Sequence, residues 1–154
     1  HKEISNSKVH HNFHVEEKYE AGIVLRGTEV KSIRMGKAQI SDSFARVDRG
    51  EVFLYHAHIH EYSFGNLNNH NPVRPRKLLL NKREIRKLEA ATQAAGKTLI
   101  PTRVYIKHGL VKVELGVCVG KKLYDKRDAL KKKADMREAE RAMKRARETG
   151  SLAR

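Results

Sequence analysis

The last 34 residues of the chain cannot build a hydrophobic core, so the fold depends on what the first 120 residues can bury. Residues 121–154 contain thirteen Lys and Arg against six Asp and Glu, and their main apolar side chains are Leu130, Met136, Met143 and several alanines. Burying so little apolar surface does not offset the entropy lost when a chain is ordered. We therefore expect one folded domain, residues 1–120, followed by a basic C-terminal tail, residues 121–154.

The tail has the composition of a helix that is not stable by itself. Ala, Lys, Arg, Glu and Met dominate it, and two acid-then-base pairs one turn apart, Asp128 with Lys132 and Glu140 with Lys144, each add about 0.2–0.5 kcal/mol of helix support. Isolated helices are marginal in water, so we expect the free tail to be disordered or nascently helical. It is either a solvated segment that keeps the protein soluble or a segment that folds when phosphates supply the opposite charge.

The charge of the whole chain favours a polyanionic partner. The formal net charge is +15 with neutral histidines, and such a surplus repels itself unless a partner neutralises it. Nucleic acid is the leading candidate. An anionic membrane would also attract this charge, but no segment approaches the roughly 18 apolar residues of a spanning helix and no signal-peptide core follows the start. We expect a cytoplasmic protein that does not associate with membranes.

Alternating apolar residues predict antiparallel strands in the first 120 residues. The stretch from Phe13 to Leu25 predicts two strands or one bent strand. "FARVDRGEVFLYHAHIHEY" predicts a hairpin with a three-residue loop, Asp48-Arg49-Gly50, and continued alternation through residue 60. "TLIPTRVYIKHGLVKVELGVCVG" predicts a second hairpin that turns at His108-Gly109. Its second strand directs alternate residues to the core: Val111, Val113, Leu115, Val117 and Val119. The single cysteine, Cys118, lies in this strand and is expected to be a buried, reduced thiol.

Two short helices are expected to flank these strands. One runs from an N-cap at Thr28 to Gly36, and the other from an N-cap at Asn81 to Gly96, with Ile85 and Leu88 on its apolar stripe. Residues 1–8 are expected to be flexible, and "SFGNLNNHNPVRPRK" is expected to be a long surface loop. Closure of many short strands removes exposed edges. The predicted fold is therefore mainly β, an OB-like antiparallel β-barrel with two or three short flanking helices.

Four sequence blocks identify a family. "YEAGIVLRGTEVKSIRMGKAQISDSFARV", "NHNPVRPRKLLLNKREI", "TLIPTRVYIK" and "GKKLYDKR" resemble, in order and spacing, the signature blocks of the SmpB family of bacterial proteins, which bind transfer-messenger RNA (tmRNA). The resemblance runs from about Asn6 to Met143. Local departures occur at the "NKKA" start, which here reads "NSKV", at Asn81 where histidine is common, and at Cys118-Val119.

The resemblance implies a function in ribosome rescue, or trans-translation. A family member binds the tRNA-like domain of tmRNA and delivers it to ribosomes stalled on messages without a usable stop codon. The implied partners are tmRNA and the ribosome, through its small-subunit rRNA and mRNA channel, and indirectly elongation factor Tu and alanyl-tRNA synthetase. The protein would be a monomer that needs no cofactor and catalyses no reaction.

Two sets of site residues follow. The set expected to bind tmRNA is Glu29, Lys31, Arg34, His70, Arg74, Arg76 and Lys77. The set expected at the ribosomal decoding centre is His11, Gly120, Lys121, Lys122, Tyr124, Asp125, Lys126, Arg127, Lys131, Lys132 and Lys133. Within the first set, Glu29 is either a reader of RNA amino or 2′-hydroxyl groups or a helix-start acid stabilised by the helix dipole. The arginines of the proline-containing loop are expected to contact phosphates along an extended backbone.

Other functions find less support in the sequence. A ribosomal or general single-strand-binding protein of the OB fold is the alternative function, and it would prefer stacked, unpaired bases. Two of the histidines His56, His58 and His60 could chelate zinc as an H-x-H pair and support a metal-dependent hydrolase, but no complementary carboxylate or cysteine motif accompanies them. No Walker loop, G-x-S-x-G or H-E-x-x-H motif is present. We expect neither a metal site nor catalysis.

Overall fold

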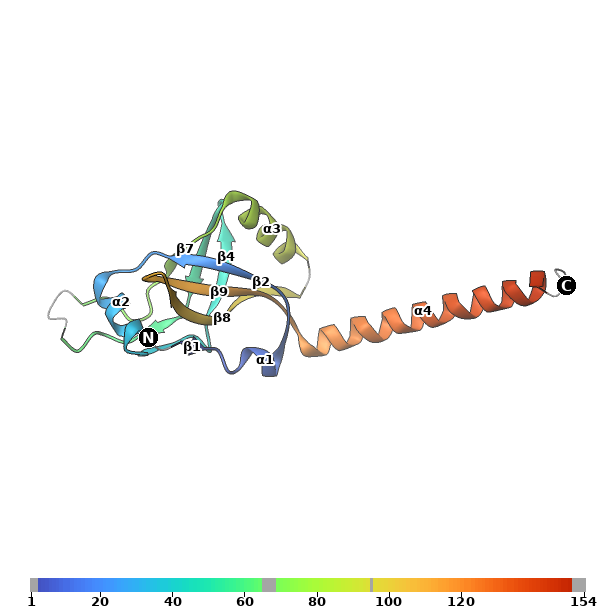
Figure 1. Ribbon diagram of the computed structural model, residues 1–154, viewed down its shortest axis with the longest axis horizontal. Coiled ribbons are helices and arrows are strands. Elements are labelled where there is room, and N and C mark those ends of the chain that lie inside the picture. The colour runs from blue at the N-terminus through green and yellow to red at the C-terminus, as the bar shows by residue number, and fades with distance from the viewer. Residues whose placement is uncertain (1–2, 65–68, 95, 151–154) are drawn as a thin grey trace. The chain divides into compact units, whose positions relative to one another are not determined.

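The computed structural model describes residues 3–64, 69–94 and 96–150 (Figure 1). The chain divides into two compact units, His1–Gly120 and Lys121–Arg154. The division falls where the apolar alternation of the last strand gives way to dense charge. The two units are described separately.

Six antiparallel strands of the first unit form a closed ring. In chain order they are β2 (Phe13–Ile23), β4 (Phe44–Asp48), β5 (Glu51–Tyr55), β7 (Arg76–Leu79), β8 (Lys97–Lys107) and β9 (Leu110–Gly120). Neighbours are hydrogen-bonded in the order β8-β4-β5-β7-β2-β9, and β9 pairs back onto β8, so the ring has no break. The prediction of a mainly β, closed antiparallel fold is confirmed.

The long hairpin of β8 and β9 provides most of one side of the core. His108 and Gly109 both have positive φ, 51° and 76°, and they form the predicted two-residue turn. The five alternating residues of β9 predicted to be in the core are all buried, and so is Cys118. The stretch that begins at Phe13 is a single strand, β2, with an irregularity in its pairing between Val15 and Glu17.

The β4–β5 turn is one residue shorter than predicted. Asp48 pairs with Glu51, and only Arg49 and Gly50 lie in the turn, with φ of 51° and 77°. Two consecutive residues with positive φ match the right-handed twist of the flanking strands. The prediction of a three-residue loop is therefore wrong.

The predicted alternation after β5 is interrupted at His56. Leu54 is buried before this residue and Ala57 after it, so the inward-facing positions change from even to odd numbers. His56 has φ 62°. This left-handed conformation breaks the extended strand, so the residues that follow face the opposite side from the one that simple alternation predicts. The chain then continues as β6 (His58–Ile59), which pairs with β3 (Ala38–Gln39).

In the described part of the first unit, three short helices accompany the ring, α1 (Val9–Asn12), α2 (Gly27–Arg34) and α3 (Lys82–Gln93). At α3 the prediction is confirmed, because the Asn81 side chain accepts a 2.8 Å hydrogen bond from the Glu84 backbone N–H and Leu88 is fully buried. At α2 the N-cap is Arg26 rather than the predicted Thr28. Residue 95, near the predicted end of this helix at Gly96, lies outside the described residues.

The N-terminal segment belongs to the fold, contrary to expectation. β1 (Ile4–Ser5) pairs with β8, and Ile4 is buried. The buried Asn6 amide donates to the carbonyl oxygens of Ile40 and Pro101 at 3.2 and 2.9 Å. These contacts connect the segment to two distant parts of the chain, which a local sequence pattern does not reveal.

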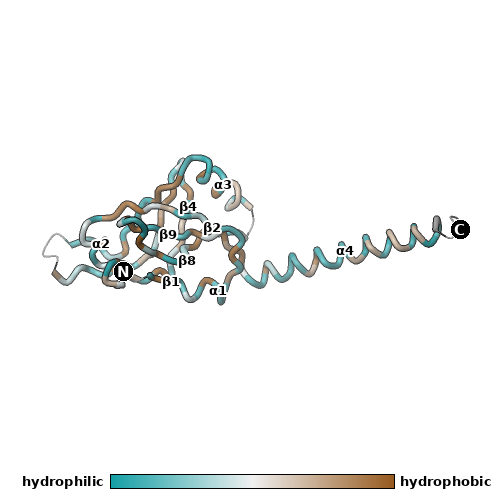
Figure 2. Tube along the Cα trace, in the orientation of Figure 1, coloured by the Kyte–Doolittle hydropathy of each residue, from teal (hydrophilic) through white to brown (hydrophobic). Residues whose placement is uncertain are grey.

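The described part of the second unit forms one helix, α4 (Lys121–Gly150), of 30 residues. Figure 2 shows that hydrophilic residues predominate along it, and no side chain between 121 and 148 is buried. The backbone is more helical than the sequence predicted, because the helix formers are uninterrupted by Gly or Pro between residues 120 and 150. Among the described residues, no helix is both long and apolar enough to cross a membrane.

Candidate nucleic-acid interface

Helix α2 presents two of the predicted cations to solvent. Ser32 and Ile33 are buried on its inner side, while Lys31 and Arg34 are exposed. This division follows from helical spacing, because residues three and four apart share a face. The exposed face of α2 therefore carries positive charge and can approach phosphates.

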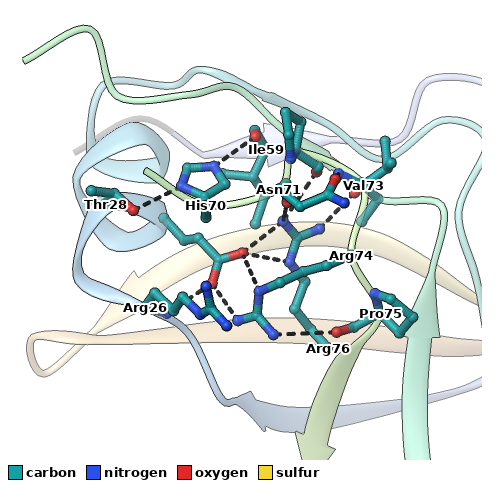
Figure 3. Close-up of polar contacts among 12 residues, drawn as sticks. Arg26, Thr28, Ile59, His70, Asn71, Val73, Arg74, Pro75 and Arg76 are labelled. Carbon is teal, nitrogen blue, oxygen red and sulfur yellow. Dashed lines mark hydrogen bonds and ion pairs between the residues drawn. The ribbon is translucent and has the colours of Figure 1, made fainter. Parts of the chain in front are cut away.

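The inner face of α2 also carries a carboxylate, Glu29, that is fully buried. One of its oxygens, Oε1, accepts a 2.8 Å hydrogen bond from the Arg26 backbone N–H, and Oε2 accepts from Arg74 Nε at 3.1 Å and from Arg76 Nε at 2.7 Å. Arg74 also donates from Nη2 to Oε1, which makes its contact two-pronged. Figure 3 shows the two guanidinium groups converging on this carboxylate.

Arg76 is fully buried, and its remaining donors are satisfied by the backbone. Its Nη1 donates to the Ala57 carbonyl at 2.7 Å, and its Nη2 donates to the Pro72 carbonyl at 3.0 Å. A buried guanidinium is tolerated when an anion and acceptors replace its water. Arg76 thereby connects α2, the segment after β5 and the loop before β7.

Glu29 and Arg76 each shift the pKa of the other in the direction that favours the charged pair. Burial alone would raise the pKa of Glu29, but hydrogen bonds from Arg74, the Arg26 backbone and Arg76 outweigh it, and the Glu29 pKa is lowered. Burial lowers the pKa of Arg76, and Glu29 partly offsets this effect. The carboxylate is therefore ionised at neutral pH.

His70 closes the same region from the loop side. Its Nδ1 lies 2.8 Å from the Thr28 hydroxyl and its Nε2 lies 2.8 Å from the Ile59 carbonyl (Figure 3). Because a carbonyl only accepts, Nε2 carries a proton and donates. His70 is 2% exposed, so it fixes the end of the loop to α2 and β6.

Three residues of the set expected to bind tmRNA are buried in this structure, and their role in RNA binding remains a prediction. Glu29 and Arg76 have no exposed surface and His70 almost none, so RNA cannot reach them in this structure. Of the two roles left open for Glu29, the structural one is supported. Lys31 and Arg34 remain exposed, Arg74 is 24% exposed while bound to Glu29, and Lys77 is 43% exposed beside Glu51. Lys77 faces away from Arg76, because successive strand residues face opposite sides.

An apolar groove beside α2 was not predicted. It has a volume of about 230 Å³ and includes Val30 of α2, Leu79 of β7, and Leu110 and Lys112 of β9. Leu79 and Leu110 are 51% and 61% exposed, which is unusual for large apolar side chains placed together. Strand alternation could have predicted this exposure, because Leu79 and Leu110 adjoin the buried residues Leu78 and Val111 and must therefore face outward.

The second predicted set divides between the two units. His11 is exposed on α1, and Gly120 ends β9 opposite Phe13, so both lie at the same end of the β2–β9 ladder. The other members of the set lie on α4 and are exposed, except the half-buried Tyr124. Lys132 forms an ion pair with Asp128 at 3.2 Å. No contact to RNA tests these residues, and their role remains a prediction.

The three strand histidines do not gather at one point. His58 and His60 have ring centroids 4.7 Å apart in an edge-to-face arrangement, whereas His56 lies at the edge of the Phe44 ring. No group of three or more His, Cys, Asp or Glu side chains with metal-binding geometry occurs among the residues described.

Comparison with known proteins identifies the family of this chain. The model of the SmpB protein family matches residues 3–145. The chain belongs to the SmpB family. It is 55% identical over 139 residues to the SsrA-binding protein of Geobacillus kaustophilus, which covers 90% of each protein. It is 58% identical over 133 residues to the SsrA-binding protein of Geotalea uraniireducens, covering 86% of this chain and 87% of the relative.

A solved structure described as "tmRNA-SmpB: a journey to the center of the bacterial ribosome" has the same fold. Its chain is 43% identical in sequence and superposes with a TM-score of 0.67. The match covers 77% of this chain and 84% of that one. The family match includes α2, Arg74, the strand β7 that begins at Arg76, and most of α4.

Proposed function

We propose that this chain binds the tRNA-like domain of tmRNA and delivers it to stalled ribosomes for trans-translation. The observation that carries this proposal is the SmpB family match over residues 3–145, with relatives named as SsrA-binding proteins. The similar solved structure, described as tmRNA-SmpB at the bacterial ribosome, supports the second step.

The body would hold the RNA through α2 and the adjacent groove. Lys31, Arg34 and the partly exposed Arg74 supply positive charge for phosphates, and the groove lined by Leu79 and Leu110 supplies apolar surface for exposed sugar and base faces. Such a surface reads the shape of a folded RNA more than its sequence. Glu29 and Arg76 contribute indirectly, because they hold α2 and the loop in position.

The tail would test whether the mRNA channel is empty. Its surplus of seven positive charges suits a path lined by rRNA phosphates, and a channel that already holds message would exclude it. Residues from Gly120 to Lys133 would follow this path, and His11 would stack near a decoding-site base. Elongation factor Tu and alanyl-tRNA synthetase would act on the bound RNA rather than on this chain. The protein would act in the cytoplasm as a monomer, without a cofactor or catalytic activity.

A binding comparison tests the first step. Fluorescence anisotropy should show tight binding to a folded tRNA-like RNA and much weaker binding to a single strand of equal length and charge. Equal affinity for both RNAs would favour the general single-strand-binding alternative. For the second step, a reconstituted translation reaction on a message without a stop codon should yield tagged peptide. A chain truncated after Asp125 should bind tmRNA but fail to support tagging, and intact tagging would refute the role of the tail.

A further inference from the structure

The segment after β6 carries two aromatic rings near Lys31 of α2, the half-buried Tyr62 and the exposed Phe64. Phe64 is 75% exposed, and its ring packs edge-to-face against Tyr62 with centroids 5.5 Å apart. The Nζ atom of Lys31, on the exposed side of α2, lies 5.3 Å from the centre of the Tyr62 ring. An ammonium and two rings thus form one continuous surface, which we call the aromatic platform, Lys31, Tyr62 and Phe64.

The backbone of Tyr62 is held in place by the side chain of Asn69. The side chain of Asn69 accepts from the Tyr62 backbone N–H at 3.1 Å and donates to the Tyr62 carbonyl at 2.7 Å. The next residue, His70, is buried and bonded to Thr28 and Ile59, as Figure 3 shows. Both sides of the loop are therefore fixed to the body, and Tyr62 is placed before any partner binds. A fixed ring loses less entropy on binding than a mobile one.

The chemistry of the platform indicates its occupant. Phe64 packs against Tyr62 but is 75% exposed, so most of its side chain is available to a partner. Aromatic faces stack on unpaired nucleobases, and a nearby cation neutralises the attached phosphate. A lipid surface would fit this group less well, because only one ring is largely exposed and no neighbouring large apolar side chain of the segment between residues 58 and 64 accompanies it.

We propose that the aromatic platform stacks on an unpaired base of the folded RNA that α2 binds. This inference rests on the proposed function, and it adds a stacked base to the contacts that α2 and the adjacent groove would make. Phe64 would provide the stacking face, Tyr62 would support it, and Lys31 would pair with the adjacent phosphate.

Substitutions at residue 64 test the proposal without disturbing the fold, because the side chain is largely exposed. Binding of the full chain to a tRNA-like RNA would be measured with Phe64→Ala, Phe64→Leu and Phe64→Tyr. Loss of a stacked base predicts affinity weaker by about five- to hundredfold for Ala, a similar loss for Leu, and nearly unchanged affinity for Tyr. Wild-type affinity in the Leu variant would overturn the proposal, because Leu keeps the apolar contact but not the ring face.

Two further measurements separate stacking from charge. With Phe64→Ala the slope of log affinity against log salt should stay constant, whereas with Lys31→Ala it should fall in magnitude by about one. In RNAs with 2-aminopurine placed at successive unpaired positions, one position should be quenched by the wild-type chain and not by Phe64→Ala. Absence of quenching at every unpaired position would overturn the platform while RNA binding itself persists. Absence of wild-type binding to the folded RNA would instead refute the proposed function.

Discussion

Glu29 and Arg76 are both fully buried, and Arg76 Nε donates to Glu29 Oε2 at 2.7 Å across 47 residues of sequence. Arg74 adds a second guanidinium from the solvent side. An ion pair at this depth is a poor source of stability compared with apolar packing, but removing one member leaves an uncompensated buried charge. Through Glu29, α2 is therefore held in position by Arg76 at the start of β7 and by Arg74 just before it.

Neutralising Glu29 should destabilise the body strongly. In Glu29→Gln the guanidinium of Arg76 loses its anion while its burial persists, and breaking such a pair costs about 3–5 kcal/mol. Urea denaturation followed by circular dichroism measures the change. The matched control is Glu51→Gln, which breaks the exposed 3.3 Å pair with Lys77 and should cost at most about 1 kcal/mol. Equal losses in the two variants would contradict the role assigned to Glu29.

The contribution of Glu29 should disappear in acid. Its pKa in the folded state is lowered, so the stabilisation is fully present above the unfolded value of about 4.3 and is lost as the pH falls towards the folded value. Below the folded pKa the wild-type carboxyl is protonated and resembles the glutamine of Glu29→Gln. The difference in unfolding free energy between the two proteins should therefore be constant from about pH 7 to 5 and shrink below about pH 4. A constant difference down to pH 3 would mean that the carboxylate contributes no charge effect.

Removing exposed cations from α2 should weaken RNA binding without affecting stability. Lys31→Ala and Arg34→Ala each remove a side chain exposed to solvent. Each should lower the salt slope of binding to a tRNA-like RNA by about one. Arg83→Ala, on the exposed side of α3, is a control of the same charge. If Arg83→Ala reduced the slope as much, the RNA face would extend to α3 and the assignment to α2 would be too narrow.

The parts of the fold with local signals were predicted from the sequence. The β8–β9 turn at His108-Gly109 and the Asn81 cap of α3 each depend on a few neighbouring residues, and both are present. The change of inward-facing positions at His56 was not predictable in this way. A positive φ is sterically unfavourable for histidine, and it is adopted here only because the strand pairing on both sides requires it. The pairing of β1 with β8 also depends on residues about 100 positions apart.

The sequence predicted which residues belong to the candidate site but not which of them are buried. Glu29, Arg74 and Arg76 were identified as one group, yet two of them are hidden by contacts that connect residues 45 to 47 positions apart. One signal was available, since Arg76 precedes the buried Leu78 by two residues and strand periodicity places both on the same face. Arg76 was nevertheless predicted to contact RNA at the surface, because charged side chains are rarely fully buried without a partner. Its partner, Glu29, lies too far away in the sequence to be recognised from a local pattern.

Truncation after Gly120 should leave the stability of the body nearly unchanged. The buried core residues lie between Ile4 and Val119, and no side chain between 121 and 148 is buried. Thermal or urea unfolding of residues 1–120 should match that of the full chain within about 0.5 kcal/mol, the usual range for surface changes. A larger loss would show that the tail contributes to the stability of the body. The helical signal lost on truncation, compared with the signal expected for α4, would measure how much of the tail is helical in free protein.

The thiol of Cys118 should be inert in the folded protein. Burial raises its pKa to about 11, so at pH 8 about one thousandth of it is thiolate, against about a quarter for an exposed cysteine with a pKa near 8.5. The residue is fully buried and packs with Val9 and Ile100, so a reagent must also wait for the fold to open. Iodoacetamide should label native protein far more slowly than protein in denaturant, and Glu29→Gln, being less stable, should label faster than wild type. Rapid labelling of the native wild-type chain would show that the β8–β9 ladder opens easily near residue 118, contrary to the packing seen there.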